Sequence, residues 1–517
     1  MIEIKTGKRE FDGLWPIVKG FLDADVREYE YKGRMVRGYR SPDCPYLWFR
    51  DHIHMMEATV YLERDIKSAV SFMLDVQQPD GHFHDFLSPD GEMLRVPTEA
   101  DVEYLAVIGV YRAWQASGDD DWMASCLPHL ERGLEYCTSH PQRWDAKYQM
   151  IKRAYTIDTW DFDYREDLTE IHWPGKIDEK THFGIMHGDV SGLYHAWTLM
   201  GRMYAGLGEI NKSKSFITKA EGLRRRANAL LFNGRFYRHR LPLDDVHIPG
   251  VNEDAQLSLS NAYDINRGLP TPDMAAAIIN EYISRRDPSR AFAEWYSIDP
   301  PFPSGVFGSG KLVPGAYVNG GIMPLVGGEL ARGAFRYGYA DYGADILRRY
   351  FELVERTGAS YLWYFPDGRP PTVETSTSPE ALPTDGWGSS AMALALVEGL
   401  AGVEDEGALF RSVNLSPKWI AAGVDEADVK VGYASSGAGV EYSFGHDAEK
   451  GQVDLRIDAG SAVKVNVLLP NGVSCIKAEL NGSAIEAGVR RSRDGVYGVM
   501  DIWGEGTREV VVRYMVG

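Results

Sequence analysis

The sequence has few cysteines, and their spacing excludes a zinc knuckle or a redox pair. The 517 residues include four cysteines, Cys44, Cys126, Cys137 and Cys475. None of them forms a CxxC pair, which both kinds of site commonly use. We therefore expect buried free thiols, as in a protein of the reducing cytoplasm.

Long apolar runs and long basic runs are missing as well. No stretch approaches the ~18 apolar residues of a membrane span, and the first fifteen residues lack the apolar core of a signal peptide. The 74 acidic and 55 basic side chains give a net charge of −19, and the longest basic run is Arg224-Arg225-Arg226. A surface this negative repels phosphate groups, so neither nucleic acid nor a membrane is an expected partner. Cytoplasmic localisation is the simplest expectation.

The histidines and acidic clusters do not form a metal-binding pattern. His52 and His54 are two residues apart, as are His82 and His84, so neither pair lies on one helical face. The acidic segment 156–167 lacks the glycine and the final glutamate of an EF-hand loop. We expect neither a metal nor an organic cofactor.

What the sequence does contain is a combination of aromatic and acidic side chains. It has 13 Trp, 28 Tyr and 19 Phe, together with 54 Gly. Most of these rings are expected in the core of a large protein. The same composition also suits a carbohydrate ligand, because a pyranose ring stacks its C–H face on Trp or Tyr and offers hydroxyls to Asp, Glu, Arg and His. Composition alone leaves both interpretations open.

Apolar residues recur at helical spacing from about residue 12 to about residue 405. The clearest segments are 54–77, 99–118, 189–208, 210–232, 272–286, 338–358 and 389–403, with weaker candidates at 12–23, 121–137, 256–268 and 319–335. Several end at Gly and a Pro-containing loop, as helices commonly do. About a dozen helices are expected.

The pattern changes near residue 410, where apolar and polar residues alternate between Gly, Asn and Asp turns. This predicts a C-terminal antiparallel β-sandwich over 409–517 that packs against a helical domain over 1–408. The helices show no repeat of 34–45 residues, which disfavours a solenoid. We therefore predict a mainly α protein, an (α/α)6 toroid of helical hairpins whose loops enclose a pocket at one end.

The first candidate site segment is CPYLWFRDHIHMMEA, residues 44–58. Asp51 lies where a helix begins, so a helix cap paired with Arg50 is one interpretation. The other is a sugar site in which Trp48 stacks on the ring, Arg50 and Asp51 bond to adjacent hydroxyls, and His52 assists. The concentration of polar groups beside Trp48 favours the sugar site.

The second segment is TIDTWDFDYRED, residues 156–167, in which Asp158, Asp161, Asp163 and Glu166 lie among three aromatic rings. A carboxylate held against aromatic rings has its charged form disfavoured, which raises its pKa and suits a general acid. Asp161 and Asp163 flank Phe162, and Trp160 precedes them. We expect this loop to line the pocket.

Two later loops complete the candidate pocket. Residues 370–399 carry Glu374 and Glu380 in a Pro- and Thr-rich stretch, followed by Trp387 between two glycines at the start of a helix. Residues 314–334 carry Tyr317 and Asn319 before the Gly320-Gly321 pair, where packing of a Gly-rich helix is an equally good explanation.

These motifs, taken together and in order, resemble the six-hairpin (α/α)6 glycosidases. WFRDH, TWDFDYR and the acidic loop ending in DGWGSS are similar to segments of the family 63 processing α-glucosidases, trehalases and amylo-α-1,6-glucosidase-like proteins. The segment YVNGG is similar to one found in the same broad group, phosphorylases included. The sequence departs from the family at Thr159, where the family has glycine before the tryptophan, and in starting its helices without a large N-terminal β-sandwich.

The resemblance implies roles for individual residues. Asp161 corresponds to the general acid, and Glu374, or failing that Glu380, to the late catalytic glutamate. Arg50 and Asp51 correspond to the pair that binds the terminal sugar, and Trp387 to the ring that walls it. The implied function is an inverting, exo-acting hydrolase of an α-linked glucoside or related oligosaccharide. A glycoside phosphorylase of the same fold and a non-catalytic carbohydrate-binding protein are the alternatives.

Overall fold

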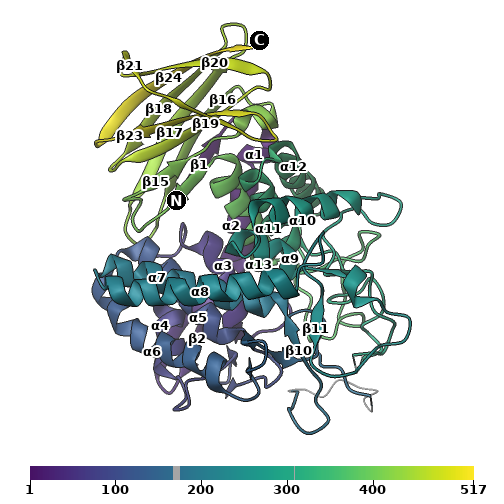
Figure 1. The fold of residues 1–517 in the computed structure, drawn as a ribbon. Helices are drawn as coiled ribbons and strands as arrows, with labels where there is room; N and C mark the ends of the chain where they lie inside the picture. The colour runs from purple at the N-terminus through teal and green to yellow at the C-terminus, as the bar shows by residue number, and fades with distance from the viewer. Residues whose placement is uncertain (167–174, 308, 517) are drawn as a thin grey trace.

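The computed structural model describes residues 1–166, 175–307 and 309–516. A helical body lies below a C-terminal region of antiparallel sheet (Figure 1). This agrees with the predicted order of a helical part followed by a β part. No helix of the described residues is both long and apolar enough to cross a membrane.

The helical body alternates inner and outer helices along the chain. The helices of the described residues are α1 Arg9–Asp12, α2 Leu14–Asp25, α3 Phe49–Thr59, α4 Ser68–Asp75, α5 Val102–Ser117, α6 Asp120–Ser139, α7 His187–Gly206, α8 Ile210–Leu230, α9 Ser260–Arg267, α10 Pro272–Ser284, α11 Pro324–Arg336, α12 Ala340–Thr357 and α13 Gly386–Leu394, which continues as the π-helix η2 Ala395–Leu400; the 3₁₀ turns are η1 Glu253–Ala255 and η3 Trp419–Ala422. The inner helix α3 packs against α5, α5 against α7, α7 against α9, α9 against α11 and α11 against α13. Helix α13 packs in turn against α3, so the circuit of contacts closes.

The prediction of one continuous helix over 54–77 is wrong, because the structure has two helices there. The structure ends α3 at Thr59 and begins α4 at Ser68. Tyr61, in the interruption, stacks on Tyr433 with ring centroids 5.6 Å apart. The backbone N–H of Ala434 also donates to the carbonyl of Val60 at 3.1 Å. Contact with the sheet region thus ends a helix that the apolar spacing alone would continue.

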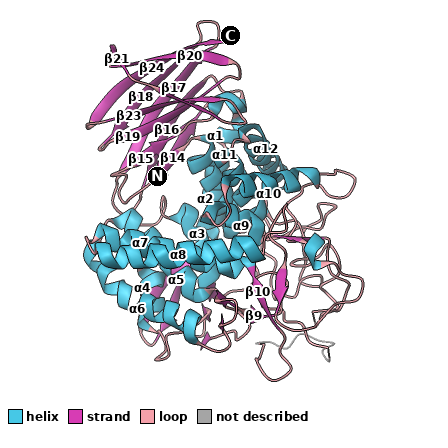
Figure 2. Ribbon diagram, in the orientation of Figure 1, coloured by secondary structure: helices cyan, strands magenta, loops and turns pink. Residues whose placement is uncertain are grey.

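Short strands occupy the loops of the helical body (Figure 2). They are β2 Val26–Tyr31, β3 Arg34–Tyr39, β4 Leu47–Trp48, β5 Phe86–Leu87, β6 Met93–Leu94, β7 Trp144–Asp145, β8 Met150–Ile151, β9 Arg153–Ala154, β10 Phe183–Met186, β11 Arg240–Pro242, β12 Leu257–Ser258 and β13 Ile298–Asp299. They form small antiparallel sheets, such as β4-β5-β6 next to the start of α3. These sheets fix the loops that lead into the inner helices.

The C-terminal region consists of two sheets in the described residues. One has the strand order β1-β16-β17-β18-β24-β20-β21 and the other β14-β15-β19-β23-β22. Their bounds are β1 Ile2–Lys5, β14 Val403–Asp405, β15 Val413–Leu415, β16 Glu426–Gly432, β17 Gly439–Asp447, β18 Gln452–Ala459, β19 Val463–Leu469, β20 Val473–Leu480, β21 Ser483–Ile485, β22 Gly488–Arg491, β23 Val496–Ile502 and β24 Gly506–Val516. Alternate residues are buried, as in β18, because one face of each strand packs inward. A Cβ at Gly498 in β23 would meet Ile476 and Val512 of the other sheet, so the two sheets face each other.

Two strands of these sheets lie outside 409–517. β1 pairs with β16, placing Ile2 opposite Val431 and Ile4 opposite Val429, and β14 precedes residue 409. The structure assigns both strands to the sheet region, which differs from the predicted division at 408/409. The four residues of β1 do not indicate which strand they pair with, because that strand, β16, lies far away in the sequence.

Candidate active site

A pocket of about 550 Å³ opens where the loops before the inner helices converge. Its described lining comes from the segments before α3, α5, α11 and α13, from the first turns of α3 and α13, and from the loop at 160–162. The lining residues are Ser41, Asp43, Cys44, Tyr46, Trp48, Arg50, Asp51, Glu99, Trp160, Asp161, Phe162, Ser309, Lys311, Tyr317, Leu362, Thr377, Ser378, Pro379 and Trp387. The volume lies within the range of small-ligand sites.

Hydrogen bonds join the first and last of these loops. Ser378 donates its hydroxyl to Asp43 Oδ2 at 3.1 Å, and the backbone N–H of Glu380 donates to the carbonyl of Asp43 at 2.8 Å. The backbone N–H of Leu382 donates to the carbonyl of Pro42 at 3.0 Å. Segments more than 330 residues apart in the sequence therefore form one continuous wall.

The aromatic residues predicted to bind sugar lie together in the pocket. The ring of Trp160 is 5.3 Å from that of Tyr317 and 6.0 Å from that of Trp387. Trp387 is fixed by its indole N–H, which donates to the Tyr263 hydroxyl at 2.8 Å. Trp48 lies on the adjoining wall, where its indole N–H donates to Cys44 Sγ at 3.0 Å. These rings provide flat apolar walls beside polar groups.

The Tyr317 side chain is buried at the pocket surface, where the charges of three carboxylates act on it. Burial raises the pKa of the Tyr317 hydroxyl well above its usual value, and the charges of Asp43, Asp161 and Asp51 raise it further. All three carboxylates line the pocket. Three acidic groups therefore lie close to Tyr317 in a cavity that six aromatic side chains help to line.

The three carboxyl groups differ in their affinity for protons. Burial raises the pKa of Asp43 to about 8, although hydrogen bonds from Ser378 and Tyr317 oppose the shift. Burial raises the pKa of Asp51 to about 6, opposed by a hydrogen bond from Ser41 and by the charge of Arg50. Burial also raises the pKa of Asp161, with Arg50 acting against it. The pocket thus holds both protonated and ionised carboxyl groups near neutral pH.

Two ion pairs hold the Arg50 side chain in place. Its Nη2 lies 2.7 Å from Glu99 Oε2, and its Nε lies 2.7 Å from Asp101 Oδ2. Its guanidinium carbon is 5.8 Å from the centre of the Trp160 ring. Arg50 therefore lines the pocket while two carboxylates hold its guanidinium group.

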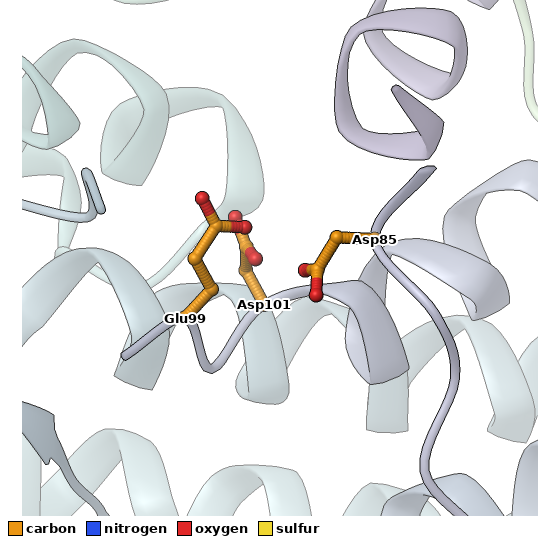
Figure 3. Close-up of side chains that lie close together, drawn as sticks. All are labelled: Asp85, Glu99 and Asp101. Carbon is orange, nitrogen blue, oxygen red and sulfur yellow. The ribbon is translucent and has the colours of Figure 1, made fainter. Parts of the chain in front are cut away.

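Glu99 and Asp101 belong to a cluster with Asp85 (Figure 3). One oxygen from each of these buried carboxylates lies within 4.8 Å of the others, a grouping that can bind a metal ion. Arg50 pairs with Glu99 and Asp101, and Arg95 lies 3.7 Å from Asp85. Burial raises the pKa values of Asp85 and Glu99, and a hydrogen bond joins the two side chains. Two guanidinium groups thus lie beside the three carboxylates and oppose their negative charge.

The structure places several predicted residues elsewhere. Glu374 is fully exposed, and a hydrogen bond from Thr372 lowers the pKa of its carboxyl. Glu380 forms an ion pair with Arg40. Neither lines the pocket, although Thr377 and Ser378 on the same loop do. Pairing Glu374 or Glu380 with Asp161 in one pocket is therefore wrong for this structure, because the loop presents its hydroxyl residues instead.

Three further predicted residues have structural contacts outside the pocket lining. His52 is buried, accepts a hydrogen bond at 3.4 Å from the Tyr39 backbone N–H, and has its pKa lowered to about 4 by burial. Asp163 accepts from Arg165 at 3.0 Å. Asn319 accepts from the backbone N–H of Phe302 at 2.7 Å and so fixes the loop that carries Tyr317.

Sequence reasoning missed several lining residues, chiefly Asp43, Glu99, Lys311 and Ser378. Glu99 carried a signal, since it stands beside Asp101 just before a helix start. No sequence pattern identifies Asp43 or Ser378 as a pocket residue, because each lies in a loop without regular secondary structure.

A second set of residues resembles a hydrolase triad. His187 Nδ1 lies 2.6 Å from Asp264 Oδ2, and its Nε2 lies 2.8 Å from Ser258 Oγ. All three side chains are buried, and none lines the pocket. A nucleophile without substrate access is inert, so this chain of hydrogen bonds holds α7 to α9.

No family model and no curated protein matches the chain. Several solved structures, however, are similar to it. The α-L-rhamnosidase from Dictyoglumus thermophilum matches 99% of this chain with 51% of its own, at 12% identity and a TM-score of 0.62. The α-L-rhamnosidase from Streptomyces avermitilis, complexed with L-rhamnose, matches 99% of this chain with 42% of its own, at 14% identity and a TM-score of 0.61. A family 63 mannosylglycerate hydrolase from Thermus thermophilus, in complex with glucose, matches 74% of this chain with 99% of its own, at 16% identity and a TM-score of 0.52.

The chain shares the fold of these glycoside hydrolases. This confirms the resemblance carried by WFRDH, TWDFDYR and DGWGSS. The chain spans about half the length of the rhamnosidases it matches. At these sequence identities the structural similarity establishes the fold alone. Any conclusion about catalysis must come from the residues of the pocket.

Proposed function

We propose that this chain is an inverting, exo-acting glycoside hydrolase that cleaves an α-linked glucoside or a related oligosaccharide. The observation that carries the proposal is the convergence of Asp43, Asp51 and Asp161 on Tyr317 in a pocket walled by Trp48, Trp160 and Trp387. We further propose that the closed circuit of inner helices, with its outer partners, is an (α/α)6 toroid, the arrangement that brings the starts of its inner helices to one pocket.

Asp161 acts as the general acid. A general acid must hold a proton near neutral pH and release it to the departing glycosidic oxygen. Burial among aromatic residues gives Asp161 a raised pKa, and the neighbouring Arg50 then stabilises the carboxylate that remains after proton transfer.

Asp51 replaces Glu374 as our candidate for the general base. The base must be ionised to take a proton from the attacking water. Asp51, with a pKa of about 6, is ionised at neutral pH, whereas Asp43, with a pKa of about 8, keeps its proton. Glu99 is occupied by Arg50. Asp43 can therefore donate a hydrogen bond to the sugar while Asp51 activates water.

The remaining pocket residues bind and orient the sugar. The indole rings stack on its apolar face, and Arg50, fixed by Glu99 and Asp101, offers donors to its hydroxyls. A pocket bounded on several sides by loops accepts the end of a sugar chain, which supports exo action.

The positive charges of the pocket favour hydrolysis over phosphorolysis. Its described lining contains two cations, Arg50 and Lys311. Arg50 is paired with Glu99 and Asp101, and Lys311 Nζ donates to the carbonyls of Val373 at 3.0 Å and Ser376 at 2.6 Å. The charge of each cation is thus already opposed by protein acceptors, and a phosphate dianion would also meet the four carboxyl groups of Asp43, Asp51, Glu99 and Asp161 in the same lining.

The test is turnover of a panel of α-linked gluco-, manno- and rhamno-disaccharides, with and without inorganic phosphate. We expect phosphate-independent release of a free sugar from at least one member. Release of a sugar 1-phosphate would identify a phosphorylase. Sugar binding without turnover across the panel would favour a binding protein.

A further inference from the structure

A second cavity lies on the outside of the helical body, between α6, α7 and α8. It encloses about 700 Å³ and shares no lining residue with the candidate active site. Trp197 of α7 and Phe216 of α8 form its largely buried aromatic part, 6% and 9% exposed, and the half-buried Trp144 forms another wall. We call this cavity the α6–α8 groove.

The indole N–H groups in the groove have no acceptor in the described part of the chain. Other indole N–H groups of the described residues fall into two classes. Those of Trp122 and Trp387 donate to Ser71 at 3.0 Å and to Tyr263 at 2.8 Å, whereas those of Trp160, Trp295 and Trp363 are buried without an acceptor. Trp144 and Trp197 show no comparable bond in residues 1–166, 175–307 and 309–516. Two aromatic surfaces that each carry an unpaired donor suit a ligand with both an apolar face and acceptors.

The rim of the groove adds polar groups of both signs. The side chains of Glu135 and Gln149 line it, are exposed, and have no hydrogen-bond partner in the described residues. Lys212, 3.6 Å from Glu131, is already partly neutralised. With Lys219 and Arg226 the groove carries three cations against two carboxylates. This near balance suits a neutral ligand better than a phosphorylated one.

We propose that the α6–α8 groove is a second carbohydrate site that binds a neutral oligosaccharide. A pyranose C–H face stacks on the exposed part of Trp144, and sugar hydroxyls pair with the indole N–H groups and with Glu135 and Gln149. Phe216 supports the groove from within, because Tyr204 stacks on its ring and Lys219 lies over it. An apolar peptide segment would leave those polar groups unpaired, at a cost in binding free energy. The choice of sugar as the ligand class rests on the proposed function. A second site tethers a long substrate and raises its effective concentration at the pocket.

The test uses protein whose pocket is disabled by Asp161→Asn and Trp48→Ala, so that neither turnover nor pocket binding obscures the groove. Binding is measured on immobilised gluco-, manno- and rhamno-oligosaccharides of three to seven sugars. We expect this protein to bind at least one series and Trp144→Ala to weaken that binding at least tenfold. Trp144→Phe, which keeps a ring, should lose much less. Trp503→Ala, which removes a tryptophan that is 77% exposed on the sheet region, is the matched control and should lose nothing.

Two results would overturn the groove proposal: no binding by the pocket-disabled protein, or binding that Trp144→Ala leaves unchanged while its melting temperature stays normal. A Trp144→Ala protein that fails to fold is replaced by Glu135→Ala with Gln149→Ala, for which the same tenfold weakening is expected. Failure of the proposed enzymatic function appears separately, as the absence of turnover by the unmodified chain.

Discussion

Single side chains in the pocket differ in protonation although they share one environment. Asp43 and Asp51 are both buried at the pocket wall, yet their pKa values are raised to about 8 and about 6. The difference arises because Asp51 stands beside Arg50, whereas Asp43 faces other acidic groups. The candidate acid and base are assigned on this basis.

Replacing the candidate acid should affect substrates according to their leaving group. Asp161→Asn is expected to lower kcat by ~10²–10⁴-fold on a disaccharide, because the departing oxygen needs a proton. On a 2,4-dinitrophenyl glycoside the loss should be much smaller, because that leaving group departs unprotonated. The measurement is kcat for both substrates. Asp163→Asn, two residues away and outside the pocket, is the matched control and should stay near wild type. Equal losses on both substrates would remove Asp161 from the acid role.

The candidate base predicts an acidic limit to activity. As the pH falls through about 6, Asp51 takes up a proton and can no longer accept one from water. The rate kcat/KM should therefore decline about tenfold per pH unit below this value, and Asp51→Asn should be nearly inactive at every pH. Glu374→Gln should keep the wild-type profile. Loss of activity in Glu374→Gln, with Asp51→Asn active, would restore Glu374 as the base.

Asp43 predicts a dependence of stability on pH. Its pKa is about 4 in an unfolded chain and about 8 in the folded one, so the folded state retains a proton that the unfolded state releases. This contribution to stability is present at low pH and is lost as the pH rises between these values. Asp43→Asn, which cannot ionise, should raise the melting temperature more at pH 8 than at pH 5. An equal effect at both pH values would show that Asp43 is ionised in the folded protein.

At the scale of helices and loops, the pocket depends on how the inner helices begin. Asp385 caps α13, accepting hydrogen bonds from the backbone N–H groups of Trp387 at 3.1 Å and Gly388 at 3.0 Å. The cap therefore fixes the turn that holds Trp387 at the pocket wall.

Removing this cap should affect stability and activity together. Asp385→Ala is expected to cost about 1–2 kcal/mol of unfolding free energy and to raise KM, because Trp387 loses its fixed position. Thr271→Ala removes the cap of α10, where Thr271 Oγ1 accepts from the backbone N–H of Met274 at 3.3 Å outside the pocket. It should cost stability alone. Urea unfolding with steady-state kinetics tests both, and unchanged KM in Asp385→Ala would separate the cap from binding.

Local sequence patterns predicted the elements far better than the site. Apolar spacing located helices such as α8 and α12 because each buries one face along its length. The same spacing missed the break after Thr59, which depends on contact with Tyr433. Asp161, Trp48 and Trp387 were predicted because each stands in a distinctive motif. Glu374 was misplaced in the pocket because no periodicity records the path of a Pro- and Thr-rich loop.

At the scale of the whole molecule, the first and last strands of the chain, β1 and β24, belong to one sheet, in which β16, β17 and β18 separate them. Ile2 and Ile4 of β1 are buried against β16, while Glu3 and Lys5 face outward. The first residues of the chain thereby complete a sheet whose other strands begin more than 400 residues later.

This closure predicts a long-range effect of an N-terminal substitution. Ile4→Ala should destabilise the protein by about 2–5 kcal/mol, as for other buried isoleucines. Glu3→Ala, its outward-facing neighbour, should change stability by less than about 0.5 kcal/mol. Denaturant unfolding followed by tryptophan fluorescence reports the difference. Equal stabilities would show that β1 is dispensable.

The central claim is inverting hydrolysis in the aromatic, acidic pocket, and the most direct measurement is the anomeric form of the first sugar released. Proton NMR of the best panel substrate, recorded before mutarotation, should show the β-anomer from an α-linkage, and Asp161→Asn should abolish its appearance. First release of the α-anomer, or turnover that survives Asp161→Asn, would contradict the account.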